Sequence, residues 1–285
     1  MREKIIHLCL VLALSAGAAM AQAGPKVPNT ADIYCSGMVT SEAVPYDTYL
    51  ISGEESNYKT TFAQNDYVFI NKGANQGVKV GDEFLVMRPV KDRGRIRWFS
   101  PQPALLRAMG TQYMDLGRLR VVIVQPNVST AQVTYACDYL QREDIVRPFA
   151  QRPAPPLKVS AKFDRFAPPS GRPAAMVVSA KDFHQSVGTN DVVYINLGSA
   201  QGVKVGDYFR IFRYQGTRHE TAYQERGMAH AVYGFGSTPS RYRWDNLPRE
   251  VLGEGIVLRV SPNASTVLIT FSQREAYLGD YVELE

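Results

Sequence analysis

A block of 24 residues occurs twice in this chain, and this duplication constrains the fold more than any other feature. Residues 65–88 read NDYVFINKGANQGVKVGDEFLVMR, residues 190–213 read NDVVYINLGSAQGVKVGDYFRIFR, and 15 of the 24 positions are identical. A second pair of blocks follows, LGRLRVVIVQPNVSTAQVTY at 116–135 and LGEGIVLRVSPNASTVLITF at 252–271. Self-similarity of this extent indicates two copies of one unit of about 110 residues.

Each copy has the sequence pattern of a small all-β fold. Apolar and polar residues alternate in short runs, and Tyr (16) and Phe (12) are plentiful. These runs are typical of strands, and we expect six per copy, arranged as a small β-barrel because closure removes exposed strand edges. The sequence therefore predicts an all-β protein with two tandem six-stranded barrel-like domains.

The hexapeptide GVKVGD, at 77–82 and 202–207, is interpreted as a turn and not as a catalytic loop. Glycine adopts positive φ without strain, and aspartate accepts hydrogen bonds from nearby backbone N–H groups. A phosphate-binding loop would need a Lys-Ser/Thr pair and a helix after it, and neither is present. The predicted structural turn residues are Gly77, Gly81, Asp82, Gly202, Gly206 and Asp207.

Comparison of the copies also predicts which side chains face inward. Arg210 aligns with Leu85 and Arg259 with Ile123, so these positions should face away from the barrel interior. The expected inward residues of the first copy are Val68, Ile70, Phe84, Val86, Val122, Val124, Val133 and Tyr135. Their counterparts are Val193, Ile195, Phe209, Ile211, Leu258, Val260, Ile269 and Phe271.

A proline-rich segment separates the copies, with seven prolines among the 28 residues 147–174. Proline removes a backbone donor and favours extended backbone, so residues 148–173 are predicted to be a semi-rigid linker. The first β-domain then covers 30–147 and the second covers 174–285, and each is expected to fold independently.

Residues 1–23 have the pattern of a secretory signal peptide. Arg2 and Lys4 precede the apolar run IIHLCLVLALSAGAA, and small residues follow at a cleavage site after Ala21 or Ala23. The run is too short to span a bilayer, and no later stretch is long enough. Export is therefore expected, and cleavage after Ala21 removes two basic residues and one acidic residue, lowering the net charge from +5 to +4.

The mature chain keeps two cysteines, Cys35 and Cys137, which are separated by 102 positions. In an oxidising compartment an even number of cysteines favours a disulfide. The alternative is two buried free thiols. A zinc site is not expected, because no other Cys or His lies at ligand spacing.

The repeated blocks of the chain resemble a known protein family. The pattern GSAQGVKVGDYFRIFR followed by LGEGIVLRVSPNAST (198–213 and 252–266) is similar to the C-terminal β-domain of flagellar assembly protein T. It also resembles β-domains beside LysM modules in secreted bacterial proteins, although this chain has no LysM repeat. The resemblance implies a protein of the periplasm or outer envelope of a Gram-negative bacterium.

The segments between the matched blocks, 89–115 and 214–251, differ between the copies and hold both tryptophans. Loops on a rigid β-scaffold commonly carry binding residues, and Arg and Trp dominate binding hot spots. The candidate partner-binding residues lie in RIRW and RYRW: Arg95, Arg97, Trp98, Arg241, Arg243 and Trp244. The alternative is that the tryptophans plug the barrel ends.

We therefore expect a non-catalytic envelope module that binds a protein or a glycan, such as peptidoglycan or another anionic surface. The alternative is a secreted hydrolase with a site in 214–251, where His219, Glu220 and Glu225 lie close in sequence. No established catalytic, metal or cofactor motif is present. The net charge is too low and too dispersed to indicate nucleic-acid binding.

Overall fold

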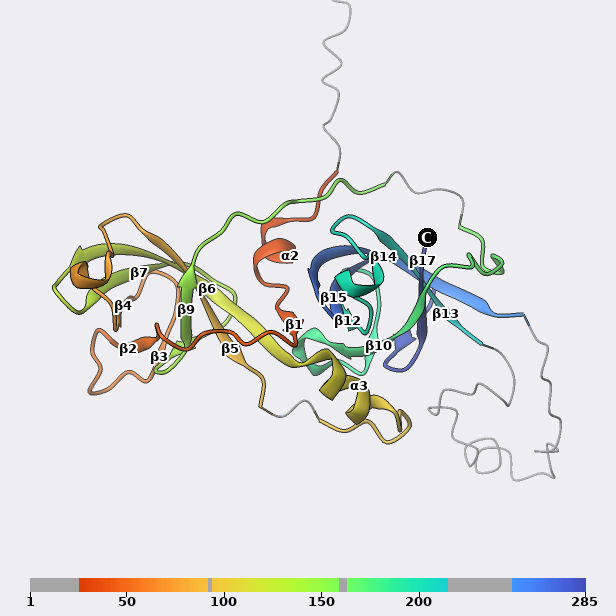
Figure 1. Ribbon diagram of the computed structural model, residues 1–285, viewed down its shortest axis with the longest axis horizontal. Coiled ribbons are helices and arrows are strands. Elements are labelled where there is room, and N and C mark those ends of the chain that lie inside the picture. Colours follow the sequence, from red (N-terminus) through yellow and green to blue (C-terminus); the bar gives the residue numbers. More distant parts are fainter. Residues whose placement is uncertain (1–25, 92–93, 159–162, 215–247) are drawn as a thin grey trace, which may run out of the picture.

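The computed structural model describes residues 26–91, 94–158, 163–214 and 248–285, and the predicted signal peptide lies outside these ranges. Two β-sheet units lie side by side, one from each sequence copy, with a short N-terminal helix between them (Figure 1). The fold is mostly β, as the alternating sequence pattern predicts.

The first copy contains nine strands and two α-helices among the residues described. The strands are β1 (Met38–Thr40), β2 (Leu50–Gly53), β3 (Thr61–Phe62), β4 (Tyr67–Ile70), β5 (Glu83–Pro89), β6 (Thr111–Val124), β7 (Ser129–Ala136), β8 (Leu140–Gln141) and β9 (Ile145–Pro148). The helices are α2 (Thr30–Tyr34) and α3 (Gln102–Met109). Six of the strands form a sheet in the order β2-β4-β7-β6-β5-β9, β1 adds to β6, and β3 pairs with β8.

The second copy forms a closed barrel. Its strands are β10 (Ala174–Ala180), β11 (Ser186–Val187), β12 (Val192–Ile195), β13 (Tyr208–Arg213), β14 (Glu250–Ser261), β15 (Ala264–Ser272), β16 (Ala276–Tyr277) and β17 (Tyr281–Leu284). The barrel order is β10-β12-β15-β14-β13-β17, and β11 pairs with β16.

The two copies share one strand order, and they differ in how the sheet ends meet. In the second copy β10 pairs with β17, so the predicted six-stranded barrel is confirmed there. In the first copy the ends meet through a bridge between Tyr49 and Ile145, and through a hydrogen bond from Val146 N to Thr48 O at 2.8 Å. Closure of the first sheet is therefore limited to a few backbone contacts.

The GVKVGD hexapeptide forms the same turn in both copies. Gly77 and Gly202 both have φ of 83°, and Gly81 and Gly206 have φ of 93° and 92°. Asp82 accepts from Lys79 N at 2.9 Å, and Asp207 accepts from Lys204 N at 2.8 Å. The glycines thus supply left-handed backbone, and the carboxylates close the turn.

Most of the expected inward residues lie in the cores. The buried members are Val68, Ile70, Phe84, Val86, Val133, Val193, Ile195, Phe209, Ile211, Leu258 and Ile269. Tyr135, Val260 and Phe271 are half-buried.

The prediction is wrong at Val122, which is half-buried, because Leu119 and Val121 fill the first core instead. Val124 is also half-buried, but it packs against this core as expected. A β-bulge lies between Val121 and Ile123, and the extra residue shifts the alternation of inward and outward side chains.

The described parts of segment 148–173 are held against the second barrel at several points. The ammonium group of Lys158 lies 2.6 Å from carboxylate oxygens of both Glu254 and Glu285. Further on, Ala167 is buried in an apolar cluster with barrel residues. The proline-rich segment therefore contributes packing to the fold.

The substitutions Gly202→Ala and Gly198→Ala should lower the free energy of unfolding by different amounts. Gly202→Ala places a Cβ in open space but at positive φ, which should cost about 1–2 kcal/mol. Gly198→Ala places a Cβ 2.1 Å from the carbonyl oxygen of Ser261, so backbone atoms must move. We expect the larger loss of unfolding free energy from Gly198→Ala, measured by denaturant titration. Equal losses of unfolding free energy in the two variants would contradict this expectation, because they would show that the backbone at Ser261 moves away from the new Cβ at little cost.

Candidate functional site at the junction of the two copies

The segment between the matched blocks of the first copy packs against the second barrel. Phe99, Leu106 and Met109 are buried in the same apolar cluster as the barrel core. Trp98 is half-buried against this cluster, and its indole N–H donates to Leu278 O at 3.4 Å. Figure 1 shows α3 lying beside β10. This segment therefore joins the two copies.

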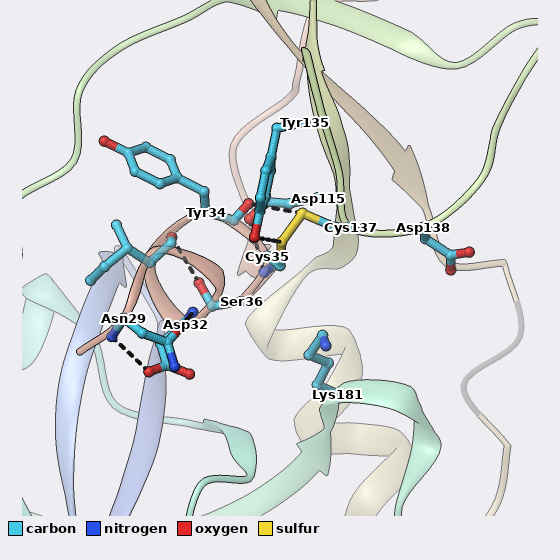
Figure 2. Close-up of a disulfide and its surroundings, with 12 residues drawn as sticks. Asn29, Asp32, Tyr34, Cys35, Ser36, Asp115, Tyr135, Cys137, Asp138 and Lys181 are labelled. Carbon is cyan, nitrogen blue, oxygen red and sulfur yellow. Dashed lines mark hydrogen bonds between the residues drawn. A yellow bond between two sulfur atoms is a disulfide. The ribbon is translucent and has the colours of Figure 1, made fainter. Parts of the chain in front are cut away.

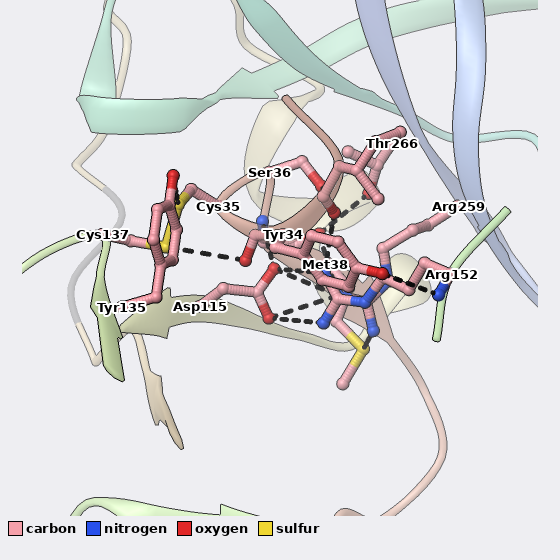
Figure 3. A network of polar contacts seen from close by, with 12 residues as sticks. Tyr34, Cys35, Ser36, Met38, Asp115, Tyr135, Cys137, Arg152, Arg259 and Thr266 are labelled. Carbon is pink, nitrogen blue, oxygen red and sulfur yellow. Dashed lines mark hydrogen bonds and ion pairs between the residues drawn. A yellow bond between two sulfur atoms is a disulfide. The ribbon is translucent and has the colours of Figure 1, made fainter. Parts of the chain in front are cut away.

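Asp115 of β6 is the central carboxylate of the junction (Figure 3). Its side chain is 1% exposed and accepts hydrogen bonds from both terminal nitrogens of Arg152, at 2.8 and 2.9 Å. Arg259 of β14 donates to the same carboxylate from 3.3 Å. The backbone N–H of Gly37 donates to it at 2.9 Å. One carboxylate thus contacts the N-terminal segment, the proline-rich segment and the second barrel.

Residues 29–40, which we call the N-terminal arm, lie between the two β units and offer backbone carbonyls to the second barrel. The hydroxyl of Tyr194 donates to Ser36 O at 2.8 Å. The hydroxyl of Thr266 and the guanidinium of Arg259 both donate to Gly37 O at 3.3 Å. The arm therefore connects the copies through its main-chain carbonyl groups, and these hydrogen bonds do not depend on the identity of its side chains.

The electrostatics of the junction follow from burial. Burial lowers the pKa of Arg259, whereas the adjacent carboxylate of Asp115 acts in the opposite direction. Burial also raises the pKa of Tyr194, so its hydroxyl stays protonated and available as a donor. Arg259 does face away from the barrel interior, as expected, but the first copy covers it.

The predicted disulfide between Cys35 and Cys137 is present (Figure 2). It ties the N-terminal arm to the residue after β7 of the first copy. The same cysteines line a small cavity of about 30 Å³ together with Lys181 and Tyr194 of the second copy. The disulfide therefore fixes the arm directly beside its contacts with the barrel.

A cleft of about 500 Å³ opens beside this junction. One wall is the end of β5 and the turn before β9, including Arg88, Lys91 and Arg142. Tyr46 of the first copy and Phe183 of the second copy also line the cleft. Both rings are about half exposed, at 53% and 51%. The cleft therefore presents one accessible aromatic ring from each copy.

Phe183 is held in an unusual backbone conformation. Asp182 and Phe183 are consecutive non-glycine residues with φ of 57° and 61°. Such left-handed backbone costs of order 1–3 kcal/mol per residue and is concentrated at functional sites. Phe183 also lines two smaller cavities of the junction. The strain therefore occurs where an exposed ring meets the cleft.

A buried Arg–Asp pair is repeated in the two copies, and sequence reasoning missed it. Arg88 donates to Asp144 from two nitrogens, at 2.7 and 2.8 Å. Arg213 does the same to Asp280, at 2.8 and 2.6 Å. The signal was available, because both arginines end the 24-residue block and both aspartates precede the last strand. In the first copy this pair lies in the wall of the cleft.

The structure separates the predicted partner-binding residues. Arg95 and Arg97 are exposed, and Arg95 lines a cavity of about 250 Å³ next to Phe183. Trp98 is directed to the second barrel, as described above. Arg241, Arg243 and Trp244 lie outside the described residues, as do His219, Glu220 and Glu225.

The comparisons do not connect the chain to a known group of proteins. No protein-family model matches it, and no curated protein matches its sequence. Among the described residues, no three His, Cys, Asp or Glu side chains gather so that they could hold a metal ion. No helix in the described ranges is both long and apolar enough to cross a membrane.

Removal of the central carboxylate should destabilise the protein strongly. Asp115→Ala leaves two largely buried guanidinium groups without their anion, and breaking a buried pair typically costs about 3–5 kcal/mol. Asp47→Ala is the matched control, because Asp47 also contacts two cations, Lys72 and Arg147, but on the surface. Denaturant titration should give a much smaller loss for the control. Equal losses for the two variants would contradict a special role for Asp115.

Removal of the disulfide should lower the free energy of unfolding. Treatment of the wild-type protein with a reducing agent should lower it by the same amount. Closing a loop of this length stabilises by at most about 4.7 kcal/mol in the chain-entropy model. The variant Cys35→Ser with Cys137→Ser should lose part of this free energy and become insensitive to dithiothreitol. A wild-type unfolding midpoint that does not change with dithiothreitol, or two alkylatable thiols in the exported protein, would contradict the disulfide.

Proposed function

We propose that this chain is a non-catalytic, exported module of the bacterial cell envelope that binds an envelope protein or glycan at the junction of its two copies. The supporting observation is the cleft of about 500 Å³, in which Phe183 is half exposed on left-handed backbone. A strained, accessible aromatic ring contributes little to the core, so a ligand contact gives a reason for it.

The proposed partner surface extends the one expected from the sequence. The first intervening segment uses its apolar side chains for docking to the barrel, which leaves Arg95 and Arg97 at the surface. Arg95 lines a cavity that shares Phe183 with the cleft. These arginines can form bidentate hydrogen bonds to carboxylate or phosphate groups. We therefore place them on the rim of the partner surface, with the aromatic rings of the cleft at its centre.

Export to the periplasm or outer envelope of a Gram-negative bacterium is part of the proposal and depends on residues 1–23. A role related to flagellar assembly remains a prediction from the resemblance in the repeated blocks. The hydrolase alternative places its site in 214–251, of which the described residues are only Tyr214 and 248–251. No observation on those residues favours it.

Phe183→Asn should separate stability from function. Asparagine tolerates left-handed backbone better than phenylalanine, so the unfolding midpoint should stay the same or rise. Capture of cross-linked envelope material by the mature protein should fall, because the ring is lost from the cleft. Thermal denaturation and pulldown yield are the two measurements.

Tyr58→Asn is the control for loss of an exposed aromatic ring, because Tyr58 is 93% exposed and does not line the cleft. It should leave both stability and envelope capture unchanged. Full envelope capture by Phe183→Asn, or none by the wild-type chain, would refute the proposed function.

A further inference from the structure

From the lining of the cleft we infer its ligand class: a neutral or weakly anionic glycan chain whose sugar rings stack on Tyr46 and Phe183. The inference rests on the proposed function and narrows the partner from protein or glycan to glycan. Three properties of the cleft carry it: the aromatic rings, the planar polar groups around them, and the balance of charge.

The aromatic rings come from different copies and are both accessible. Tyr46 stacks on Tyr49, with ring centres 5.2 Å apart and planes inclined by 11°, so one ring supports the other. Phe183 lies on left-handed backbone, which restrains its main chain. A sugar ring has an apolar face of C–H groups, which packs on an aromatic face with little loss of conformational entropy when that face is already held in place.

Planar polar side chains surround these rings. Gln141 ends β8, Arg142 and Glu143 form the turn before β9, and all three residues line the cleft. Amide, guanidinium and carboxylate groups together offer donors and acceptors to vicinal hydroxyl groups. Such a mixture suits a polyhydroxylated ligand, because each sugar hydroxyl can both donate and accept.

The charge of the lining disfavours a strongly acidic polymer. Arg88 is bonded at two positions to Asp144 and so is largely neutralised within the wall. The remaining charged groups are Lys91, Arg142 and Glu143, which leave a net charge of one positive unit. A site for a polyanion collects several cations, whereas this balance fits a neutral or weakly acidic chain.

Peptide binding by strand addition is also disfavoured. That mode needs a strand with an unpaired edge. β5 ends in the cleft, and it already pairs with β6 on one side and β9 on the other. Ile145 of β9 also lines the cleft and is bridged to Tyr49. Its last residue, Pro89, has no N–H to donate.

The test is calorimetric titration of the full mature chain with three probes: N-acetylglucosamine hexamer, peptide-free glycan strands from peptidoglycan, and poly-L-glutamate. We expect at least one glycan to bind and poly-L-glutamate not to bind at physiological salt. Tyr46→Ala and Phe183→Ala should each weaken glycan binding roughly three- to tenfold, the value of an aromatic stacking contact. Tyr46→Phe should retain binding, and Tyr58→Ala is the matched control.

The outcomes are distinct. Binding of neither glycan, or glycan binding that is unaffected by both alanine variants, overturns the inference. Envelope capture that depends on Phe183 but disappears when the envelope is treated with protease shows a protein partner, which overturns the glycan assignment and leaves the proposed function intact. Tight, salt-sensitive binding of poly-L-glutamate in place of glycan would also overturn it.

Discussion

The arrangement of the whole molecule depends on one buried carboxylate. Asp115 lies on the first copy, yet its two cationic partners are Arg152 of the proline-rich segment and Arg259 of the second barrel. A carboxylate removed from water is tolerated only when charged or polar donors surround it. Hydrogen bonds from four nitrogen atoms supply that environment, and they also fix three separate parts of the chain at one point.

Duplication explains the scaffold, and divergence explains the junction. Both copies keep the strand order and the buried Arg–Asp pair. They differ at equivalent outer positions: Ile123 is exposed in the first copy, whereas Arg259 meets the carboxylate of the other unit. The first copy also adds α3 (Gln102–Met109), whose apolar side chains join the second core.

The proposed binding site is a consequence of that docking. Eleven of the twelve residues that line the cleft belong to the first copy, and Phe183 of the second copy adds the twelfth. The disulfide and the N-terminal arm hold the two walls together, since Cys35 precedes the carbonyl groups that accept from Tyr194 and Thr266.

The sequence by itself determined the repeat, the strand-rich fold, the GVKVGD turns and the pairing of Cys35 with Cys137. These depend on local alternation, on glycine conformation and on a count of cysteines, all of which can be read along the chain. Tertiary structure alone decided that Trp98 docks on the second copy, that Val121 replaces Val122 in the core, and that a cleft forms at the junction. Each of these results from contacts between residues distant in sequence, or from a bulge that shifts the alternation, and no local pattern encodes them.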